Sequence, residues 1–275
     1  MFKKCKRAVV NTDDSYGDIL YDSLNIEKSR IGIVYPADAK AVEIKNKSFE
    51  GIEYFYKEKD LIFKLRLKLA GLYNVYNSLL AIKCTTMLGI KPNVAKSALN
   101  NLKQIEGRLT KVSDNPCVVI DYAHTPFAMK NALKSLYTAK TSGQKLIIVF
   151  GCGGDRDKYK RSKMGKLAIE YADVVYITED NSRSESFEKI LSDILSDIKA
   201  SEKIRVIKDR ETAILTAIKN ADQKDIVALI GKGHERYIVK DGASLPFSEK
   251  QIVEKALQER KNKYENKTCT AGKIK

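Results

Sequence analysis

The sequence predicts an α/β fold in which a Rossmann-like, mostly parallel sheet with helices on both faces forms the C-terminal part of the chain. From Cys117 onward, short apolar runs alternate with stretches that carry apolar residues at three- and four-residue spacing. The apolar runs predict strands at residues 117–122, 145–150, 174–178, 204–207 and 226–230. The intervening stretches predict helices at residues 125–139, 161–171, 186–199 and 211–220. Repeated strand–helix–strand order is typical of a parallel sheet.

The first hundred residues are less regular. Two strands are predicted at residues 7–11 and 30–35, around a helix at residues 16–24. Alternation over residues 44–68 indicates antiparallel strands, and residues 74–89 and 92–102 have the pattern of two helices. A boundary near residues 103–107 would divide the chain into domains 1–104 and 105–275, since 275 residues suffice for two ordinary cores.

Composition indicates a folded, cytoplasmic protein. The chain has 43% hydrophobic and 31% charged residues, and no apolar run approaches the roughly 18 to 20 residues of a membrane helix. Five scattered cysteines without a CxxC pair argue against a disulfide framework and a structural zinc site. The net charge of +15 would attract phosphate-bearing partners, but the lysines are dispersed, so we expect solvated lysine faces and no nucleic-acid or membrane partner.

The chemically dense segments all lie at or just after the ends of predicted strands. They are residues 121–126, 151–157, 179–183 and 231–235. Because ligands of parallel sheets bind beyond the carboxyl ends of the strands, we expect these four loops to share one edge of one sheet.

The glycine-rich loop at residues 151–157 partly matches the dinucleotide fingerprint GxGxxG. The match fails at the third glycine, where Arg156 stands. Glu179 and Asp180 end the next strand, where a ribose-binding acid belongs, so a dinucleotide-dependent oxidoreductase stays an alternative. A tight glycine turn without a ligand is the other alternative.

Only two histidines occur in the chain, His124 and His234, and each lies in one of these loops. The segment DYAHTP at residues 121–126 places a carboxylate at a strand end with an imidazole behind it. The segment GKGHE at residues 231–235 offers backbone amides, the cation of Lys232 and a carboxylate, a set suited to a zwitterionic amino acid.

Together these motifs resemble the Mur ligases, in particular their MurE branch. The resemblance rests on AVVNTDDSYG at residues 8–17, GLYNVYN at 71–77, EGR at 106–108, DYAHTP, GCGGDRD at 151–157, DNSR at 180–183 and GKGHE. It covers nearly the whole chain. It implies a ligase that adds the third residue, meso-diaminopimelate, to UDP-MurNAc-L-Ala-D-Glu, using ATP and Mg²⁺ through an acyl phosphate, in a monomeric enzyme.

Carried over residue by residue, the resemblance assigns Asn74 and Asn77 to adenine. It places Arg108 and Asp121 on the nucleotide at the domain seam, and His124 near the phosphates as the catalytic residue. It assigns meso-diaminopimelate to Arg156, Asp180, Asn181, Ser182, Arg183, Gly231 and Glu235. No metal ligand is expected in this chain.

The family's motif for diaminopimelate is DNPR, and here Ser182 replaces the proline while Arg183 is kept. Diaminopimelate carries one carboxylate more than lysine, which a planar guanidinium can grip with two charge-assisted hydrogen bonds. With lysine bound, a buried Arg183 would lack its partner, a defect of about 3 to 5 kcal/mol, or roughly a hundred- to a few thousand-fold in affinity. An ordinary surface arginine is the alternative, and Ser182 is expected to loosen the loop.

A ligase of this class also needs a phosphate-binding loop of the GxxGK[ST] type, and the sequence contains none. We therefore expect residues 1–104 to be the back half of a central ATP-binding domain and residues 105–275 to be the C-terminal amino-acid-binding domain. On this expectation the chain alone does not ligate and is a fragment, an alternative start or half of a split gene. A non-catalytic amino-acid-binding module remains the alternative.

Overall fold

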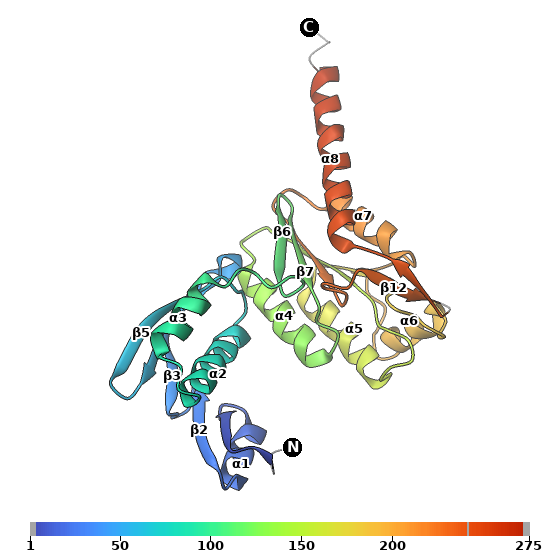
Figure 1. The fold of residues 1–275 in the computed structure, drawn as a ribbon. Coiled ribbons are helices and arrows are strands. Elements are labelled where there is room, and N and C mark those ends of the chain that lie inside the picture. Colours follow the sequence, from blue (N-terminus) through green and yellow to red (C-terminus); the bar gives the residue numbers. More distant parts are fainter. Residues whose placement is uncertain (1–3, 241, 272–275) are drawn as a thin grey trace. The chain divides into compact units, whose positions relative to one another are not determined.

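The computed structural model describes residues 4–240 and 242–271, and the chain forms two compact units, residues 1–104 and 105–275. The first unit is a five-stranded sheet in the order β1-β2-β3-β4-β5 with helices α1, α2 and α3 (Figure 1). Its elements are β1 (Arg7–Asn11), α1 (Ser15–Ser23), β2 (Glu27–Gly32), β3 (Ala39–Asn46), a 3-10 turn (Ser48–Glu50), β4 (Ile52–Glu58), β5 (Leu61–Leu67), α2 (Tyr73–Met87) and α3 (Pro92–Asn101).

In the first unit β1, β2 and β3 are parallel, whereas β3, β4 and β5 are antiparallel. The antiparallel strands bury alternate residues, as a sheet with one solvated face does. Buried positions such as Tyr54, Leu65 and Leu79 join the sheet to α2. The predicted antiparallel region is confirmed, but its first strand begins earlier, at Ala39, where it pairs with β2.

The strand predicted at residues 30–35 is displaced. It begins at Glu27 and ends at Gly32, because the carboxylate of Asp13 accepts the next three backbone N–H groups. These donors are Ile33, Val34 and Tyr35, at 2.6 to 2.9 Å. The chain therefore turns around Asp13 instead of continuing along the sheet.

The second unit is built on a six-stranded sheet in the order β10-β9-β8-β11-β7-β6, with a separate hairpin of β12 and β13. Its strands are β6 (Thr110–Asp114), β7 (Cys117–Asp121), β8 (Leu146–Phe150), β9 (Val174–Ile177), β10 (Ile204–Val206), β11 (Ile226–Ile230), β12 (Tyr237–Lys240) and β13 (Ala243–Pro246). Its helices are α4 (Pro126–Ala139), α5 (Tyr159–Tyr171), α6 (Phe187–Leu195), α7 (Arg210–Asn220) and α8 (Glu249–Ala271). Within the six-stranded sheet all pairings are parallel except that of β6 with β7, and the separate hairpin of β12 and β13 is antiparallel.

Helices α4, α5 and α6 pack side by side, and α7 packs with α8 (Figure 1). From β7 to β8, β9 and β10, each strand lies further toward one edge of the sheet than the strand before it in the sequence. The connection from β10 to β11 goes the opposite way, because β11 lies between β8 and β7. Since parallel crossovers are right-handed, the first three helices and α7 lie on opposite faces. Val118, Val149 and Leu229 point from successive strands toward α7 and α8 in one core. The predicted α/β class with a mostly parallel sheet is confirmed.

Each predicted strand and helix of this unit is present within a few residues of its expected place. The sequence pattern missed β6, the β12–β13 hairpin and α8. The edge strand β6 carries a bulge between Lys111 and Ser113, and the opposite edge strand, β10, is only 3 residues long.

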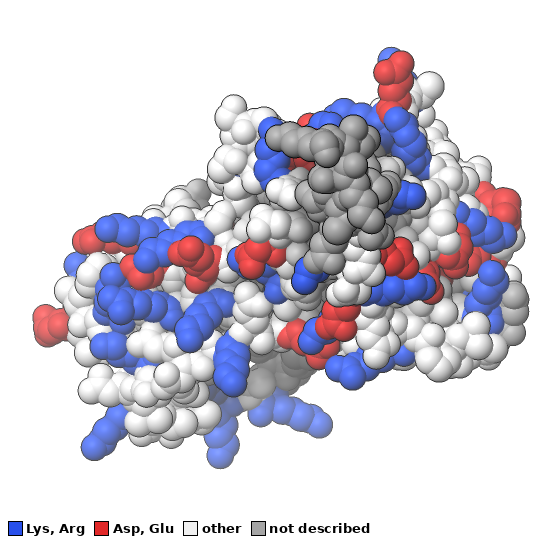
Figure 2. Space-filling model, turned by 90° about the horizontal axis from the view of Figure 1, so that it is seen from above, with Lys and Arg blue, Asp and Glu red and all other residues white. Residues whose placement is uncertain are grey.

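Lys and Arg side chains are spread over the face shown in Figure 2, with Asp and Glu among them. In the described part of the chain, no helix combines the length and apolar character needed to cross a membrane.

Candidate functional site

The four polar loops of the second unit meet in one cavity of about 540 Å³ at the carboxyl ends of β7, β8, β9 and β11. Among the residues expected to bind ligand, those that line it are His124, Arg156, Asp180, Asn181, Arg183, Gly231 and Glu235. Tyr122, Cys152, Lys160 and Tyr237 also line it. The structure therefore brings together residues that are more than a hundred positions apart in the sequence.

Two of these loops are tied to each other by hydrogen bonds. The N–H of Gly154 donates to the carbonyl of Asn181 at 2.8 Å, and the carboxylate of Asp155 accepts from the N–H and hydroxyl of Ser184. A Cβ at Gly154 would lie 1.8 Å from the carbonyl oxygen of Ser182, so only glycine permits this approach. Because of these contacts, the loops after β8 and β9 form one rigid wall of the cavity.

Arg161, on α5, supports this wall from below. Its side chain has no exposed surface and donates to Glu185, Asp193 and the carbonyl of Gly153. The hydrogen bonds from Arg161 lower the pKa of Glu185 to about 2, although partial burial opposes them. Glu185 also accepts the N–H of Asp155 at 2.7 Å, so this one ion pair anchors both ends of the glycine-rich turn.

Arg183 is held by one nitrogen. Its Nη1 donates to the carbonyls of Gly154 at 2.7 Å and Asn181 at 3.2 Å. Within the described residues, Nε and Nη2 make no hydrogen bond, and the side chain lines the cavity. Its backbone has a φ of +52° and pairs with β12, since its N–H donates to Val239. The guanidinium is therefore fixed in place with donors left for a ligand.

Arg156 lines the same cavity and is exposed, with Nη1 donating to the neighbouring carbonyl of Asp155. Ser182 is 3% exposed and does not line the cavity. The carbonyl of Ser182 accepts the N–H of Glu185 at 3.0 Å. Of the DNSR segment, Ser182 thus packs inward while the residues on both sides of it face the cavity.

Lys232 does not line the cavity, so the structure does not bear out the expectation that its cation is offered to an amino acid. Its side chain is fully buried and is not part of the cavity wall. The ammonium instead contacts Asp180 Oδ1 at 3.4 Å, Asn181 Oδ1 at 3.0 Å and Glu235 Oε2 at 3.0 Å. These three acceptors replace the water that the ammonium loses on burial, as a buried charge requires.

Asp180 is surrounded by positive charge. Burial raises the pKa of its carboxyl, but the charges of Lys232 and Arg210 outweigh burial and hold the pKa below its usual value. Gly231 has a φ of +117°, and a Cβ there would come within 3.0 Å of Asp180 Oδ2. Glycine is thus required beside the carboxylate.

The EGR and GKGHE segments touch through their glycines. Gly107 has a φ of +71°, and a Cβ there would lie 2.4 Å from the backbone nitrogen of His234. A Cβ at Gly233 would lie 2.5 Å from the Cβ of Tyr122. Only backbone without side chains fits between these loops, which explains why two separate motifs both contain glycine at the contact.

The ring of Tyr122 is the centre of an aromatic cluster. The guanidinium of Arg108 lies 4.8 Å from its centroid, and the rings of His124 and His234 lie 4.8 and 5.0 Å away. His124 Nδ1 is 3.1 Å from the carbonyl of Tyr122, which can only accept, so Nδ1 is the donor in this contact. Lys160 donates to the carbonyl of His124 at 2.8 Å.

Asp121 is almost completely buried under this cluster. Its two oxygens accept the N–H groups of Leu109 at 2.7 Å and Ala123 at 2.8 Å. Burial raises the pKa of Asp121, and these hydrogen bonds oppose the rise. Each carboxylate oxygen has a second lone pair, so the proposed contact with a nucleotide is compatible with these bonds.

Asn74 and Asn77 lie on α2 of the first unit. Asn77 Nδ2 donates to Asn74 Oδ1 at 3.1 Å, and Asn74 Nδ2 donates to the carbonyl of Ala70 at 2.7 Å. Between them Tyr76 donates to Asp13 Oδ2 at 2.8 Å. The NTDD and LYNVYN segments, which sequence reasoning treated separately, are therefore joined in one unit.

Sequence reasoning missed Arg161 and Arg210 as parts of the site, because an arginine on a helix usually marks a solvated face. Both are buried beneath the cavity. Arg210 donates to the carbonyls of Glu179 and Ile230, the residues just before Asp180 and Gly231. The only sequence signal was position, since Arg210 follows the N-cap Asp209 of α7.

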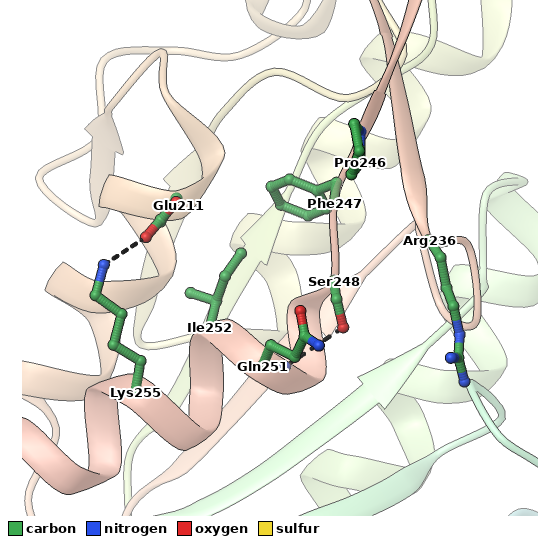
Figure 3. A pocket seen from close by; sticks show the side chains of 8 residues that line it. All are labelled: Glu211, Arg236, Pro246, Phe247, Ser248, Gln251, Ile252 and Lys255. Carbon is green, nitrogen blue, oxygen red and sulfur yellow. Dashed lines mark hydrogen bonds and ion pairs between the residues drawn. The ribbon is translucent and has the colours of Figure 1, made fainter.

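A second hollow of about 390 Å³ lies between the β12–β13 hairpin, α7 and the start of α8 (Figure 3). Its lining residues are Glu211, Arg236, Pro246, Phe247, Ser248, Gln251, Ile252 and Lys255. Lys255 is paired with Glu211 at 2.8 Å, and Ser248 accepts the N–H of Gln251. Its charged groups are thus already matched within the protein.

Two family models match the chain. The model of the Mur ligase middle domain matches residues 1–85, and that of the Mur ligase glutamate ligase domain matches residues 107–233. The chain belongs to the Mur ligase family. The UDP-N-acetylmuramoyl-L-alanyl-D-glutamate--2,6-diaminopimelate ligase of Caldanaerobacter subterraneus subsp. tengcongensis is 39% identical to this Mur ligase over 263 residues, which are 94% of this chain and 54% of the relative. Ligase 1 of that name from Clostridium acetobutylicum is 36% identical over 263 residues, with the same coverage.

Solved structures of Mur ligases and related ligases have the same fold as this chain. A structure with the same ligase name superposes with a TM-score of 0.60 at 30% identity, covering 93% of this chain and 53% of that one. A pseudomurein peptide ligase type C from Methanothermus fervidus superposes with a TM-score of 0.65 at 19% identity over 84% of this chain and 55% of its own, which shows a shared fold. Because the chain belongs to the Mur ligase family, the alternative of a dinucleotide-dependent oxidoreductase is wrong. This Mur ligase chain spans about half the length of the curated relatives it matches.

Proposed function

We propose that the protein acts in the ATP-dependent ligation of meso-diaminopimelate to UDP-MurNAc-L-Ala-D-Glu during the synthesis of peptidoglycan precursors. The names of the relatives support this substrate pair. The observation that carries the proposal is Arg183, whose guanidinium is held at Nη1 and offers Nε and Nη2 to the cavity. These two nitrogens are the pair that grips a carboxylate with two parallel hydrogen bonds.

The cavity has a donor side and an acceptor side, as a zwitterion requires. Arg183 and Arg156 provide donors for a carboxylate. Glu235 Oε1, which has only the hydroxyl of Tyr122 at 3.5 Å, faces the cavity as an acceptor for an ammonium. The distal end of meso-diaminopimelate carries both groups on one carbon. Lysine carries the ammonium alone and would leave Arg183 without its partner, which favours diaminopimelate.

The chemistry is an amide synthesis. The side-chain carboxylate of the D-glutamate takes the γ-phosphoryl group of ATP and becomes an acyl phosphate, with release of ADP. The amine of diaminopimelate then attacks this carbonyl carbon, the C–O bond to phosphate breaks, and amide and phosphate form while the nitrogen loses a proton. In this proposal, His124 lies near the phosphates. Asn74, Asn77, Arg108 and Asp121 contact the nucleotide.

Magnesium would accompany the phosphates of ATP, since Mg²⁺ is usually bound by one or two carboxylates together with substrate phosphates. In residues 4–240 and 242–271, no group of three or more His, Cys, Asp and Glu is arranged to hold a metal ion. No step is therefore assigned to a metal held by these residues. We propose that the reaction takes place in the cytoplasm.

The test measures ligand binding to the purified chain through the shift of its melting temperature. Binding to the native state adds RT ln(1+[L]/Kd), or about 2.7 kcal/mol at a ligand concentration of 100 Kd. We expect meso-diaminopimelate to raise the melting temperature and lysine to raise it far less at equal concentration. Equal shifts of the melting temperature from the two amino acids would show that Arg183 does not bind the extra carboxylate of diaminopimelate.

A second candidate function is amino-acid binding without catalysis. It is favoured by one observation, that every residue lining the cavity comes from the second unit. ATP hydrolysis that depends on the UDP-linked dipeptide and diaminopimelate distinguishes the two functions. A binding module would bind the amino acid and show no such hydrolysis.

A further inference from the structure

The buried ammonium of Lys232 organises the residues that line the cavity without lining it itself. Lys232 follows β11, is fully enclosed, and has Asp180, Asn181 and Glu235 as its three acceptors. The rings of Tyr237 and Phe247 lie 5.8 and 5.9 Å from the ammonium. All three acceptors belong to the cavity wall, so any displacement of Lys232 changes that wall directly.

The first consequence concerns the side-chain amide of Asn181. Its Oδ1 receives two donors, Lys232 Nζ at 3.0 Å and the N–H of Val239 at 2.9 Å. The opposite orientation of the amide would point its NH₂ group at both donors, which is unfavourable. Lys232 and Val239 together therefore hold Nδ2 on the side of Glu235 and the cavity, where it presents a donor.

The second consequence concerns Glu235. Its Oε2 accepts from Lys232 at 3.0 Å and from Asn181 Nδ2 at 2.9 Å. With Oε2 engaged twice, the carboxylate is fixed so that Oε1 is the oxygen left for a ligand. Without Lys232, the carboxylate would keep only the contact of Oε2 with Asn181 and would be free to rotate about it.

We infer that Lys232 is a positioning residue for amino-acid selection: its ammonium orients Asn181 as a donor and Glu235 as an acceptor for the distal carboxylate and ammonium of the substrate. This inference rests on the proposed function, because it uses the same cavity and the same amino acid. It goes beyond that function by assigning selectivity to a side chain that never touches the ligand.

The experiment compares Lys232→Met with the unmodified chain by calorimetric titration with meso-diaminopimelate. Methionine keeps an unbranched apolar stem between Tyr237 and Phe247 but removes the three hydrogen bonds. We expect the affinity to fall roughly 10- to 100-fold, the range for lost hydrogen bonds to charged groups. Lys255→Gln is the matched control, since Lys255 is a surface lysine with one carboxylate partner, and its affinity should equal that of the unmodified chain.

A double-mutant cycle separates positioning from general support of the fold. On a Glu235→Leu background the acceptor that Lys232 orients is already absent, so Lys232→Met should lower the affinity less than about threefold further. Equal losses on both backgrounds would mark a structural role and overturn the inference. Near-native affinity of Lys232→Met in the otherwise unmodified chain would overturn it as well.

A variant that retains the charge covers the case in which Lys232→Met does not fold. Lys232→Arg keeps the positive charge but replaces a three-donor ammonium by a planar fork, which does not suit the same three acceptors. We expect a loss of roughly tenfold in affinity for meso-diaminopimelate. Unchanged affinity would show that charge alone suffices and would overturn the inference. An unmodified chain that fails to bind meso-diaminopimelate overturns the proposed function instead, which is a distinct result.

Discussion

Arg210 and Glu249 form a buried ion pair in which Nη2 of the arginine lies 2.7 Å from Oε1 of the glutamate, and each side chain is 1% exposed. The same guanidinium donates to the carbonyls of Ile230 at 3.1 Å and Glu179 at 3.4 Å. The first residue of α8 is thereby joined to the ends of β9 and β11, where two of the four cavity loops begin. The floor of the site thus depends on a helix that contributes no residue to its wall.

Arg210→Met should destabilise the protein by about 3 to 5 kcal/mol, because it leaves the Glu249 carboxylate buried without its cation. Glu249→Gln should cost less, since burial already raises the pKa of Glu249 and an amide oxygen can still accept from Arg210. The measurement is the free energy of unfolding in urea. Lys208→Gln breaks an exposed pair with Glu188 and should change it by about 1 kcal/mol or less. Equal losses for Arg210→Met and Lys208→Gln would contradict this account.

Arg183→Met should reduce the affinity for meso-diaminopimelate by about a hundredfold or more without weakening lysine binding, because only diaminopimelate has a carboxylate for this guanidinium. Titration calorimetry with both amino acids measures the ratio. Arg205→Met, at an exposed arginine of β10, is the control and should change neither affinity. Parallel losses for both ligands would show that Arg183 supports the loop rather than selecting the substrate.

The Arg161–Glu185 pair should make stability depend on acid pH. Hydrogen bonds from Arg161 lower the pKa of Glu185 from 4.5 to about 2, so the carboxylate contributes stability above pH 4.5 and loses it as the pH falls toward 2. Urea unfolding of the unmodified chain and of Glu185→Gln should differ most at neutral pH, and the difference should shrink across this window. A difference that persists undiminished at pH 2 would refute the assignment.

Gly107→Ala should be clearly more destabilising than Gly89→Ala. Both glycines have positive φ, which costs an L residue about 1 kcal/mol or more. Only at Gly107 would the added Cβ also meet backbone, 2.4 Å from the nitrogen of His234, whereas nothing lies within 4 Å at Gly89. Thermal unfolding of the two variants measures the difference. Similar melting temperatures would mean that the loops at Gly107 and Gly233 separate easily.

The sequence pattern located the central strands because each is a run of apolar residues buried on both faces, such as Leu146–Phe150. It missed β6 and the β12–β13 hairpin, whose residues are at most partly buried and show no alternation of buried and exposed positions. It also missed α8, where the buried residues up to position 262, such as Ile252 and Val253, lie in the first turns. Elements at the margin of a core leave little periodic signal, since their stability comes from contacts that are distant in sequence.

For the site, residue type and position after a strand were enough to predict which loops meet. They were not enough to predict which side chain faces the cavity. Lys232 and Glu235 lie in one five-residue motif, yet the lysine is enclosed and the glutamate lines the cavity. The difference arises from acceptors on another loop, Asp180 and Asn181, which capture the ammonium. Such pairing depends on three-dimensional proximity that spacing along the chain does not encode.

Both open edges of the sheet in the second unit are poor templates for another chain. On one side, the bulge between Lys111 and Ser113 interrupts the row of hydrogen-bonding groups of β6. On the other side, β10 has only 3 residues, and Arg205 in its middle is exposed. Short, charged or bulged edges discourage strands of neighbouring molecules from adding to a sheet. Both edges of the six-stranded sheet therefore disfavour the addition of a strand from a neighbouring molecule.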